Sequence, residues 1–238
     1  HPMRILVGGG FYDTLLEAEH TDPPSFPSPG EISDGSLATA WLVASDLNRI
    51  KFIIRTDATF NCGTSQPVEY PAPPDRRIKL TAHDVAYSIN NSSGDETLNS
   101  RGRSIGRFAN QWEALSDRAL IAHTNPDQLY SYWPWLLSNI FSSTPIVSAW
   151  LADQGDEMDM TTPCGSGPFH LTEWESPDDL VGRPVDHHWR GINPSIEELK
   201  FVLMPEEDLR IAALKTGKIQ MAPLEVTALV ETHDEILG

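Results

Sequence analysis

The stretch TTPCGSGPFHLTEW, residues 161–174, places two glycines, a serine and a proline directly before an alternation of apolar residues. Gly165 and Gly167 lack a Cβ atom, so they can adopt a positive φ or let another backbone approach closely. Pro168 has a fixed φ and no N–H, and Phe169 opens a pattern of apolar residues at every second position. The stretch therefore predicts a tight connection that leads into a strand.

The same part of the chain gives little support for catalysis or metal binding. Pro168 stands where a phosphate-binding helix would need a free N–H. Ser166 has glycine neighbours, but the hydrolase pattern G-x-S-x-G needs glycine two residues earlier, where this chain has Cys164. His187 and His188 are adjacent, so their rings diverge on a strand or a helix and do not easily chelate one metal ion. We expect no catalytic residue, no metal site and no cofactor.

The composition is that of a soluble globular protein with a strongly acidic surface. Hydrophobic residues make up 39% of the 238 residues, and acidic side chains outnumber basic ones 34 to 17, for a formal net charge of -17. Such a surface repels phosphate backbones and anionic lipid, so we expect no nucleic-acid partner. The start HPMRILVGGG lacks the apolar core of a signal peptide, which fits a mature secreted protein or a chain trimmed at its N-terminus.

Hydrophobic periodicity and turn residues predict mixed α and β structure. Thr81 is the expected N-cap of one helix, and Gly217 is the expected C-cap of an amphipathic helix on which Leu209, Ala212 and Ala213 stack. The expected strands cover 48–60, 167–176 and 199–205, and a hairpin covers 112–124 with its turn at Ser116–Arg118. The expected helices cover 80–92, 127–141 and 206–219, and residues 20–35 are expected to form a loop.

Several segments, taken in order, resemble the family 5 extracytoplasmic solute-binding proteins, the peptide- and nickel-binding receptors of ATP-binding-cassette (ABC) importers. The most specific is PCGSGPFHLTEW, which is similar to the family's Gly-Thr-Gly-Pro-Tyr turn and strand, with Ser166 for Thr and Phe169 for Tyr. The others are FYDTLLEA (11–18), LATAWLVASDLNRIKFIIRTDATFNCG (37–63), LTAHDVAYSI (80–89), WEALSDRALIAHTNP (112–126) and HHWRGINPSIEELKFVLMPEEDLRIAALKTGKIQMAP (187–223).

The resemblance implies an α/β fold of the periplasmic-binding-protein type, type II, peptide-binding class. Within one lobe, residues 1–11 and 151–238 would form the main part, with a mixed sheet flanked by helices, and 12–150 a smaller inserted α+β subdomain. The glycines and Pro168 of the opening stretch would then form a rigid turn that returns the chain to the main sheet. The second lobe, which closes over the ligand in the family, is expected to be absent from this chain.

The two cysteines, Cys62 and Cys164, are too isolated for a paired zinc site, and by themselves they fit either one disulfide or two buried thiols. Both replace residues that are not usually cysteine in the family's motifs. A disulfide that ties the two turns together is therefore a hypothesis.

The resemblance also implies a receptor rather than an enzyme, one that binds oligopeptides or a similar small nutrient and presents it to a membrane permease. Arg103 is favoured as a contact because a guanidinium can hold a carboxylate through two bonds. The regions that correspond to the family's lobe-one contacts contain Met3, Arg4, Arg101, Arg103, Ser142, Ser143 and Thr144.

We expect this receptor to be monomeric and periplasmic or extracellular, with a lipid anchor on the outer face of the cytoplasmic membrane as one form of attachment. The alternative function is a stand-alone interaction or scaffold module that kept one lobe of the fold and does not transport.

Overall fold

The computed structural model describes residues 10–16, 36–62, 77–93, 105–127, 144–149, 164–175 and 179–224. The chain divides into two compact units: unit 1 comprises residues 1–174 and 181–199, and unit 2 comprises 175–180 and 200–238. The aromatic helix expected at 127–141 lies outside the described residues except for its first residue, and the loop expected at 20–35 lies wholly outside them. The expected division into a main part and an inserted subdomain stays a prediction.

Unit 1 contains a four-stranded antiparallel sheet that confirms the hairpin prediction. The single strand expected over 48–60 is wrong in its extent, because it is interrupted at 55–58: residues 49–54 belong to this sheet and 59–62 to another. Along the second strand of the four-stranded sheet every second side chain is buried, namely Ile50, Phe52 and Ile54, and these side chains form the core face of the sheet. Phe52 stacks on Trp112 with ring centroids 5.7 Å apart. The strand order is β1-β2-β6-β5, with β1 at Ala38–Val43, β2 at Arg49–Ile54, β5 at Ala109–Ser116 and β6 at Ala119–Thr124.

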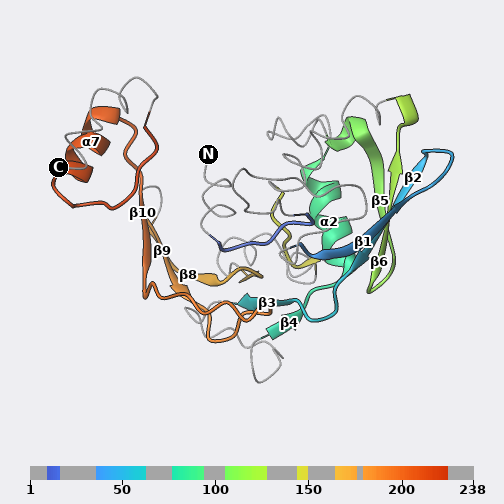
Figure 1. Cartoon of the computed structure of the whole chain (residues 1–238), viewed down its shortest axis with the longest axis horizontal. Helices are drawn as coiled ribbons and strands as arrows, with labels where there is room; N and C mark the ends of the chain where they lie inside the picture. Colours follow the sequence, from blue (N-terminus) through green and yellow to red (C-terminus); the bar gives the residue numbers. More distant parts are fainter. Residues whose placement is uncertain are drawn as a thin grey trace. The chain divides into compact units, whose positions relative to one another are not determined.

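Helix α2, Ala82–Ser92, packs on one face of this sheet (Figure 1). It begins as predicted at Thr81, whose backbone N–H and hydroxyl both donate to the Asp84 carboxylate at 2.8 Å. Asn90 joins the helix to the sheet, because its side-chain amide donates to the carbonyl of Trp112 at 2.8 Å and accepts from the Trp112 N–H at 3.0 Å. Burial of Val85 and Ile89 against the sheet completes the core.

Two further sheets have three strands each. One has the order β4-β3-β7, with β3 at Thr59–Cys62, β4 at Arg77–Lys79 and β7 at Cys164–Gly165. The other has the order β10-β9-β8, with β8 at Phe169–Glu175, β9 at Asp179–Pro184 and β10 at Leu199–Val202. The turn at 166–168 thus joins two sheets, whereas a return to one main sheet was expected. Pro168 cannot donate to a ladder, so β7 ends before it and β8 begins after it.

Unit 2 contains helix α7, Glu207–Lys215, which confirms the helix predicted over 206–219. Acidic Glu207 lies in its first turn. The C-cap is Thr216, and Gly217, the expected C-cap, follows it with a φ of +70°. The expected apolar stack is wrong in two of its three members: Ala213 is buried, but Ala212 is exposed and Leu209 is 54% exposed. Helical spacing places Leu209 and Ala213 on one side of α7, yet burial does not extend from Ala213 to Leu209.

Candidate functional site

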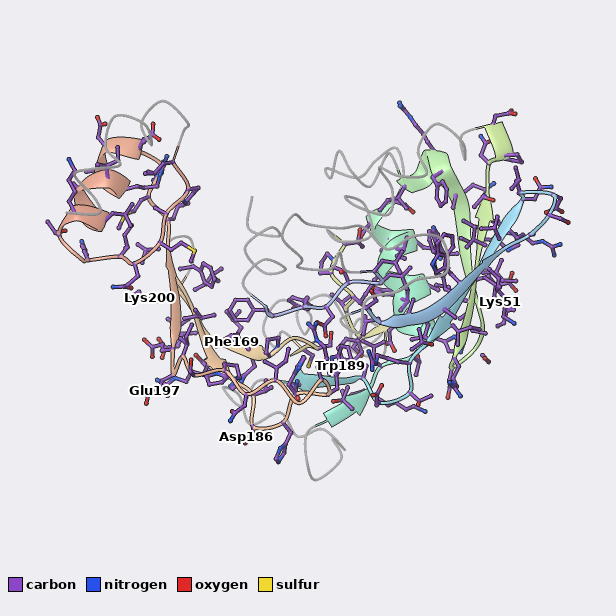
Figure 2. The ribbon with its side chains drawn as sticks, in the orientation of Figure 1. Lys51, Phe169, Asp186, Trp189, Glu197 and Lys200 are labelled. Atoms are coloured by element: carbon purple, nitrogen blue, oxygen red, sulfur yellow. The ribbon has the colours of Figure 1, made fainter. Side chains whose placement is uncertain are left out.

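A buried polar cluster in unit 1 joins residues that lie far apart in the chain. We call it the Asp13 cluster, and it consists of Asp13, Ser166, His188, Trp189 and Arg190. Trp189 lies in the connection between β9 and β10 (Figure 2). A polar group inside a protein is costly unless it finds hydrogen-bond partners, so the satisfied contacts of this cluster hold distant segments together.

The glycines of the opening stretch lie against the segment that carries Asp13. The amide of Gly167 donates to the carbonyl of Phe11, and the amide of Phe169 donates to the carbonyl of Gly10, both at 3.1 Å. A Cβ atom at Gly165 would overlap the carbonyl oxygen of Phe11, and one at Gly167 would overlap that of Gly10. Neither glycine has a positive φ. Of the two reasons for these glycines, close backbone approach is the one that applies.

The Asp13 carboxylate is buried and receives hydrogen bonds from two neighbouring side chains. The indole Nε1–H of Trp189 donates to Oδ2 at 2.8 Å, and the guanidinium of Arg190 donates to Oδ1 at 3.3 Å. The backbone N–H of Asp13 donates to the Ser166 hydroxyl at 3.2 Å. A buried carboxylate with charge-assisted partners is a strong structural tie, and removing one partner is costly.

His188 is enclosed in the cluster and held in its neutral form. Burial, with the charge of Arg190 as a smaller cause, lowers the pKa of His188 from 6.5 to about 4. Its Nδ1 faces the backbone N–H of Arg190 at 3.4 Å and must accept, so Nε2 carries the proton and donates to the Ser166 carbonyl at 3.1 Å. The imidazole contacts the carbonyl of Ser166 and not its hydroxyl, which is the partner a Ser-His-Asp triad requires.

Two arginines flank the indole of Trp189. The Arg55 guanidinium lies 4.0 Å from the ring centroid and that of Arg190 lies 5.2 Å from it. Arg55 also bonds the Asp57 carboxylate, at 2.7 Å from Nε, and the carbonyl of Ser36 at 3.2 Å. Both cations therefore already face carboxylates of this chain, so the cluster is suited to positioning the backbone rather than to capturing an anion.

The segment 144–149 is held between Asp13 and helix α2. The amide of Ile146 donates to the carbonyl of Asp13 at 3.2 Å. On its other side, the amide of Val147 donates to the Ser88 hydroxyl and the amide of Ala149 donates to the Asp84 carboxylate, both at 2.9 Å. Helix α2 thereby fixes the chain that follows one of the predicted ligand regions.

Of the predicted ligand residues, the structure describes one. Thr144 is buried, with 3% of its surface exposed, two residues before Ile146. Its role in binding stays a prediction. Met3, Arg4, Arg101, Arg103, Ser142 and Ser143 lie outside the described residues.

Sequence reasoning did not identify Asp13, Trp189 or Arg190 as a cluster. A signal was present: Asp13 stands among the apolar residues Phe11, Leu15 and Leu16, and a carboxylate in such a segment requires a buried partner. The sequence contains no indication of which distant cation or indole that partner is.

The hypothesis of a disulfide is supported. Cys164 is disulfide-bonded, and since Cys62 is the other cysteine of the chain, it is the partner. The two residues face each other in the antiparallel register of β3 and β7. Within the described parts of the chain, no three His, Cys, Asp or Glu residues gather as a metal site would require, and no helix is long and apolar enough to span a membrane.

The comparisons with known proteins agree with this architecture. Protein XP55 of Streptomyces lividans is 25% identical over 206 residues, which is 86% of this chain and 34% of that protein. The periplasmic binding protein DppA of Helicobacter pylori, solved with the peptide STSA, has a TM-score of 0.66 at 21% identity, over 97% of this chain and 44% of DppA. The oligopeptide-binding protein AppA of Bacillus subtilis, solved with a nonapeptide, has a TM-score of 0.62 at 18% identity, over 88% of this chain and 37% of AppA.

The chain spans less than half the length of each of these relatives. The structural likeness confirms the expected fold, that of one lobe of a peptide-binding-class periplasmic binding protein. A family model described as bacterial extracellular solute-binding proteins, family 5 Middle, matches residues 34–235. The chain therefore belongs to the family 5 bacterial extracellular solute-binding proteins.

Proposed function

We propose that this chain is the first lobe of a receptor that binds oligopeptides or a similar small nutrient for an ABC importer. The observation that carries the proposal is the match of nearly the whole chain to the folds of DppA and AppA, both solved with a peptide bound. In a cleft of this kind, main-chain hydrogen bonds hold an extended peptide while roomy, hydrated pockets accept varied side chains.

The Asp13 cluster supports the placement of the ligand regions. Asp13 follows the region of Met3 and Arg4, and the carbonyl of Asp13 accepts from Ile146, which follows the region of Ser142–Thr144. Two of the three regions proposed to contact the ligand thus run into the same buried junction. A rigid junction would hold their backbones in place and lower the entropy lost when a ligand binds.

Family 5 proteins are binding proteins that work outside the cytoplasm, and we extend this to the chain as a whole. Its proposed partners are a peptide or other small molecule, which lobe closure would trap, and the membrane permease that recognises the closed form. We propose a monomer without catalytic activity or nucleic-acid binding. Attachment through a lipid anchor is part of the proposal.

Native mass spectrometry of the protein purified from its own host tests this function. A receptor should carry a small co-purified ligand that is lost on denaturation and can be sequenced as a peptide or identified as another nutrient. Isothermal titration of the stripped protein with synthetic copies of that molecule should then restore binding. Absence of any bound small molecule, together with no heat of binding from a mixed di- to pentapeptide pool, would favour the stand-alone interaction module.

A further inference from the structure

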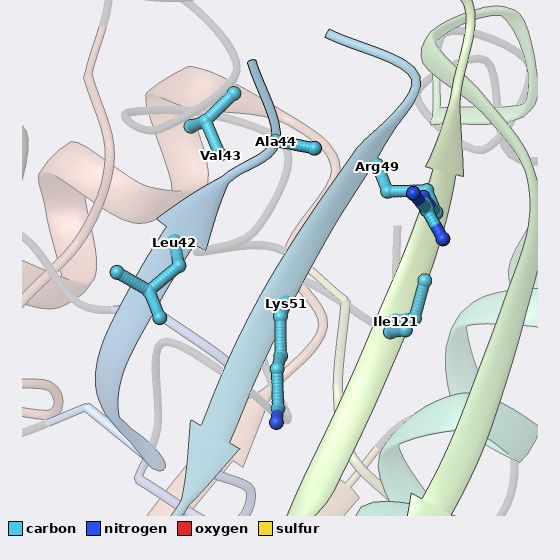
Figure 3. A pocket seen from close by; sticks show the side chains of 6 residues that line it. All are labelled: Leu42, Val43, Ala44, Arg49, Lys51 and Ile121. Atoms are coloured by element: carbon cyan, nitrogen blue, oxygen red, sulfur yellow. The ribbon is translucent and has the colours of Figure 1, made fainter. Parts of the chain in front are cut away.

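The outer face of the four-stranded sheet, opposite α2, carries a shallow pocket of about 200 Å³ (Figure 3). We call it the Lys51 pocket. It lies on exposed β structure in unit 1, and none of its lining residues belongs to the Asp13 cluster or is among the residues proposed to bind the transported ligand. Its lining residues are Leu42, Val43, Ala44, Arg49, Lys51 and Ile121.

The strand register places a cation between apolar neighbours in this pocket. Lys51 of β2 pairs with Leu42 of β1 on one side and with Ile121 of β6 on the other. Side chains directly opposite each other on one face of a sheet lie within contact range. Leu42 is 65% exposed and Val43 is 37% exposed, so the apolar part of the pocket faces solvent. An exposed apolar patch beside a lysine favours an amphipathic partner.

The pocket lining carries two positive charges, on Arg49 and Lys51, although the whole chain is strongly acidic. None of the six lining residues is acidic, whereas acidic residues outnumber basic ones 34 to 17 in the chain. Glu113, in the same cross-strand row, is bonded to His123 at 3.1 Å. Asp46 lies 4.0 Å from Arg49, but both side chains are about half exposed, and such pairs contribute little. Lys51 has no ion pair among the described residues.

The volume of the pocket limits the size of the group that it can hold. Small-molecule sites usually measure roughly 300–1,000 Å³, so about 200 Å³ suits one or two side chains of a larger partner. A net charge of -17 opposes adsorption to an anionic lipid surface and also opposes docking of a second copy of this chain. The two cations of the pocket, Arg49 and Lys51, in contrast complement a short segment of a partner that carries one or two carboxylates.

We propose that the Lys51 pocket is a docking site for a protein partner, which it binds through an extended segment whose pocket-facing positions, every second residue, include both acidic and apolar side chains. The acidic side chains lie over Lys51 and Arg49, and the apolar ones cover Leu42 and Ile121. This site is independent of the proposed nutrient binding.

Fluorescence anisotropy with labelled, capped peptides tests the proposal on the full chain. The probe carries glutamate and valine in turn at every second position, with serine between them, so that both side-chain types share one face of the extended peptide; in the matched control probe lysine replaces glutamate. The glutamate probe should bind, and its affinity should fall as salt rises because exposed charges are screened. Lys51→Glu should weaken binding by about 10-fold or more, and Leu42→Ala by about 3- to 5-fold through the lost apolar contact.

Lys79→Glu is the matched control, because Lys79 is an exposed strand lysine of unit 1 and the change in net charge is the same. This variant should bind the glutamate probe like the unchanged chain. The proposal is overturned if the glutamate probe fails to bind, if the lysine probe binds equally well, or if Lys51→Glu and Lys79→Glu behave alike. Lys51-dependent binding to vesicles of an anionic phospholipid, or Lys51-dependent dimers in sedimentation, would assign the pocket to a membrane or a second copy instead.

Discussion

The indole of Trp189 donates a 2.8 Å hydrogen bond to the carboxylate of Asp13, although 176 positions separate the two residues in the chain. This bond joins the segment that begins the described structure to the connection between β9 and β10. Arg190 strengthens the tie, since its guanidinium reaches the second oxygen of the same carboxylate. The first prediction concerns this carboxylate.

Replacing Asp13 by asparagine should lower the free energy of unfolding by about 3 kcal/mol, because the half-buried Arg190 loses its counter-charge and faces amide hydrogens. Urea unfolding followed by circular dichroism measures the change. Asp57→Asn is the matched control: Asp57 is an exposed partner of Arg55, so its loss should cost at most about 1 kcal/mol. Equal losses in the two variants would show that the Asp13 cluster is not a structural junction.

Replacing Gly165 by alanine should destabilise the protein by about 3 kcal/mol or more, because the new Cβ atom overlaps the backbone carbonyl of Phe11, which has no freedom to rotate away. Gly191→Ala separates this effect from backbone strain, since Gly191 has open space around it and a φ of +67°. That change should cost only about 1 kcal/mol. Urea midpoints of the two variants test the difference, and a Gly165→Ala midpoint at or above that of Gly191→Ala would contradict it.

Reducing the disulfide between Cys62 and Cys164 should lower stability by about 2–4 kcal/mol, because the bond closes a long loop and restricts the unfolded chain. Urea unfolding with and without dithiothreitol measures this loss. The double variant Cys62→Ala/Cys164→Ala should not respond to the reductant. Two reactive thiols in denatured, unreduced protein would remove the disulfide altogether.

Acidification from pH 6.5 toward pH 4 should destabilise the protein through His188. Burial lowers the pKa of this histidine to about 4 in the folded state, while in the unfolded state it keeps its ordinary value of 6.5. Between these values the unfolded chain binds the proton and the folded chain does not, so stability falls as pH falls, by about 3 kcal/mol in total, and the contribution levels off below the folded pKa.

Free energies of unfolding across this pH range test the assignment. His188→Gln should reduce the slope without abolishing it, since burial also lowers the pKa of His170, and His187→Gln should leave the slope unchanged because His187 is exposed. A slope that is the same in His188→Gln as in the unchanged chain would assign the pH dependence to other groups.

Replacing Arg103 by alanine should weaken binding of the co-purified ligand by about 10-fold or more, if that ligand carries a carboxylate that the guanidinium holds through two bonds. Arg118→Ala, in the exposed β5–β6 turn, should leave the affinity unchanged. Isothermal titration of both variants measures the effect. Equal affinities would remove Arg103 from the proposed contacts, whereas a loss of ligand binding in both would point to the fold.

Local signals sufficed for the elements whose causes lie within a few residues. Thr81 and Asp84 stand three positions apart and form the cap of α2 by themselves, so this helix start was predictable. The β5–β6 hairpin and the end of α7 at Gly217 follow the same logic, since turn residues and periodicity act over one or two turns of chain. The family resemblance added the fold, because ordered motifs over most of the chain carry more information than any single one.

Contacts between distant segments set the rest. Gly165 and Gly167 are required because the carbonyls of Phe11 and Gly10 lie against them, and not because of a positive φ. The sequence by itself does not distinguish these two reasons. Likewise, Leu209 had the periodicity of a core residue and remains exposed. Periodicity and caps depend on near neighbours and can be read along the chain, whereas burial and the partner of Asp13 depend on which remote surface the folded backbone brings into contact.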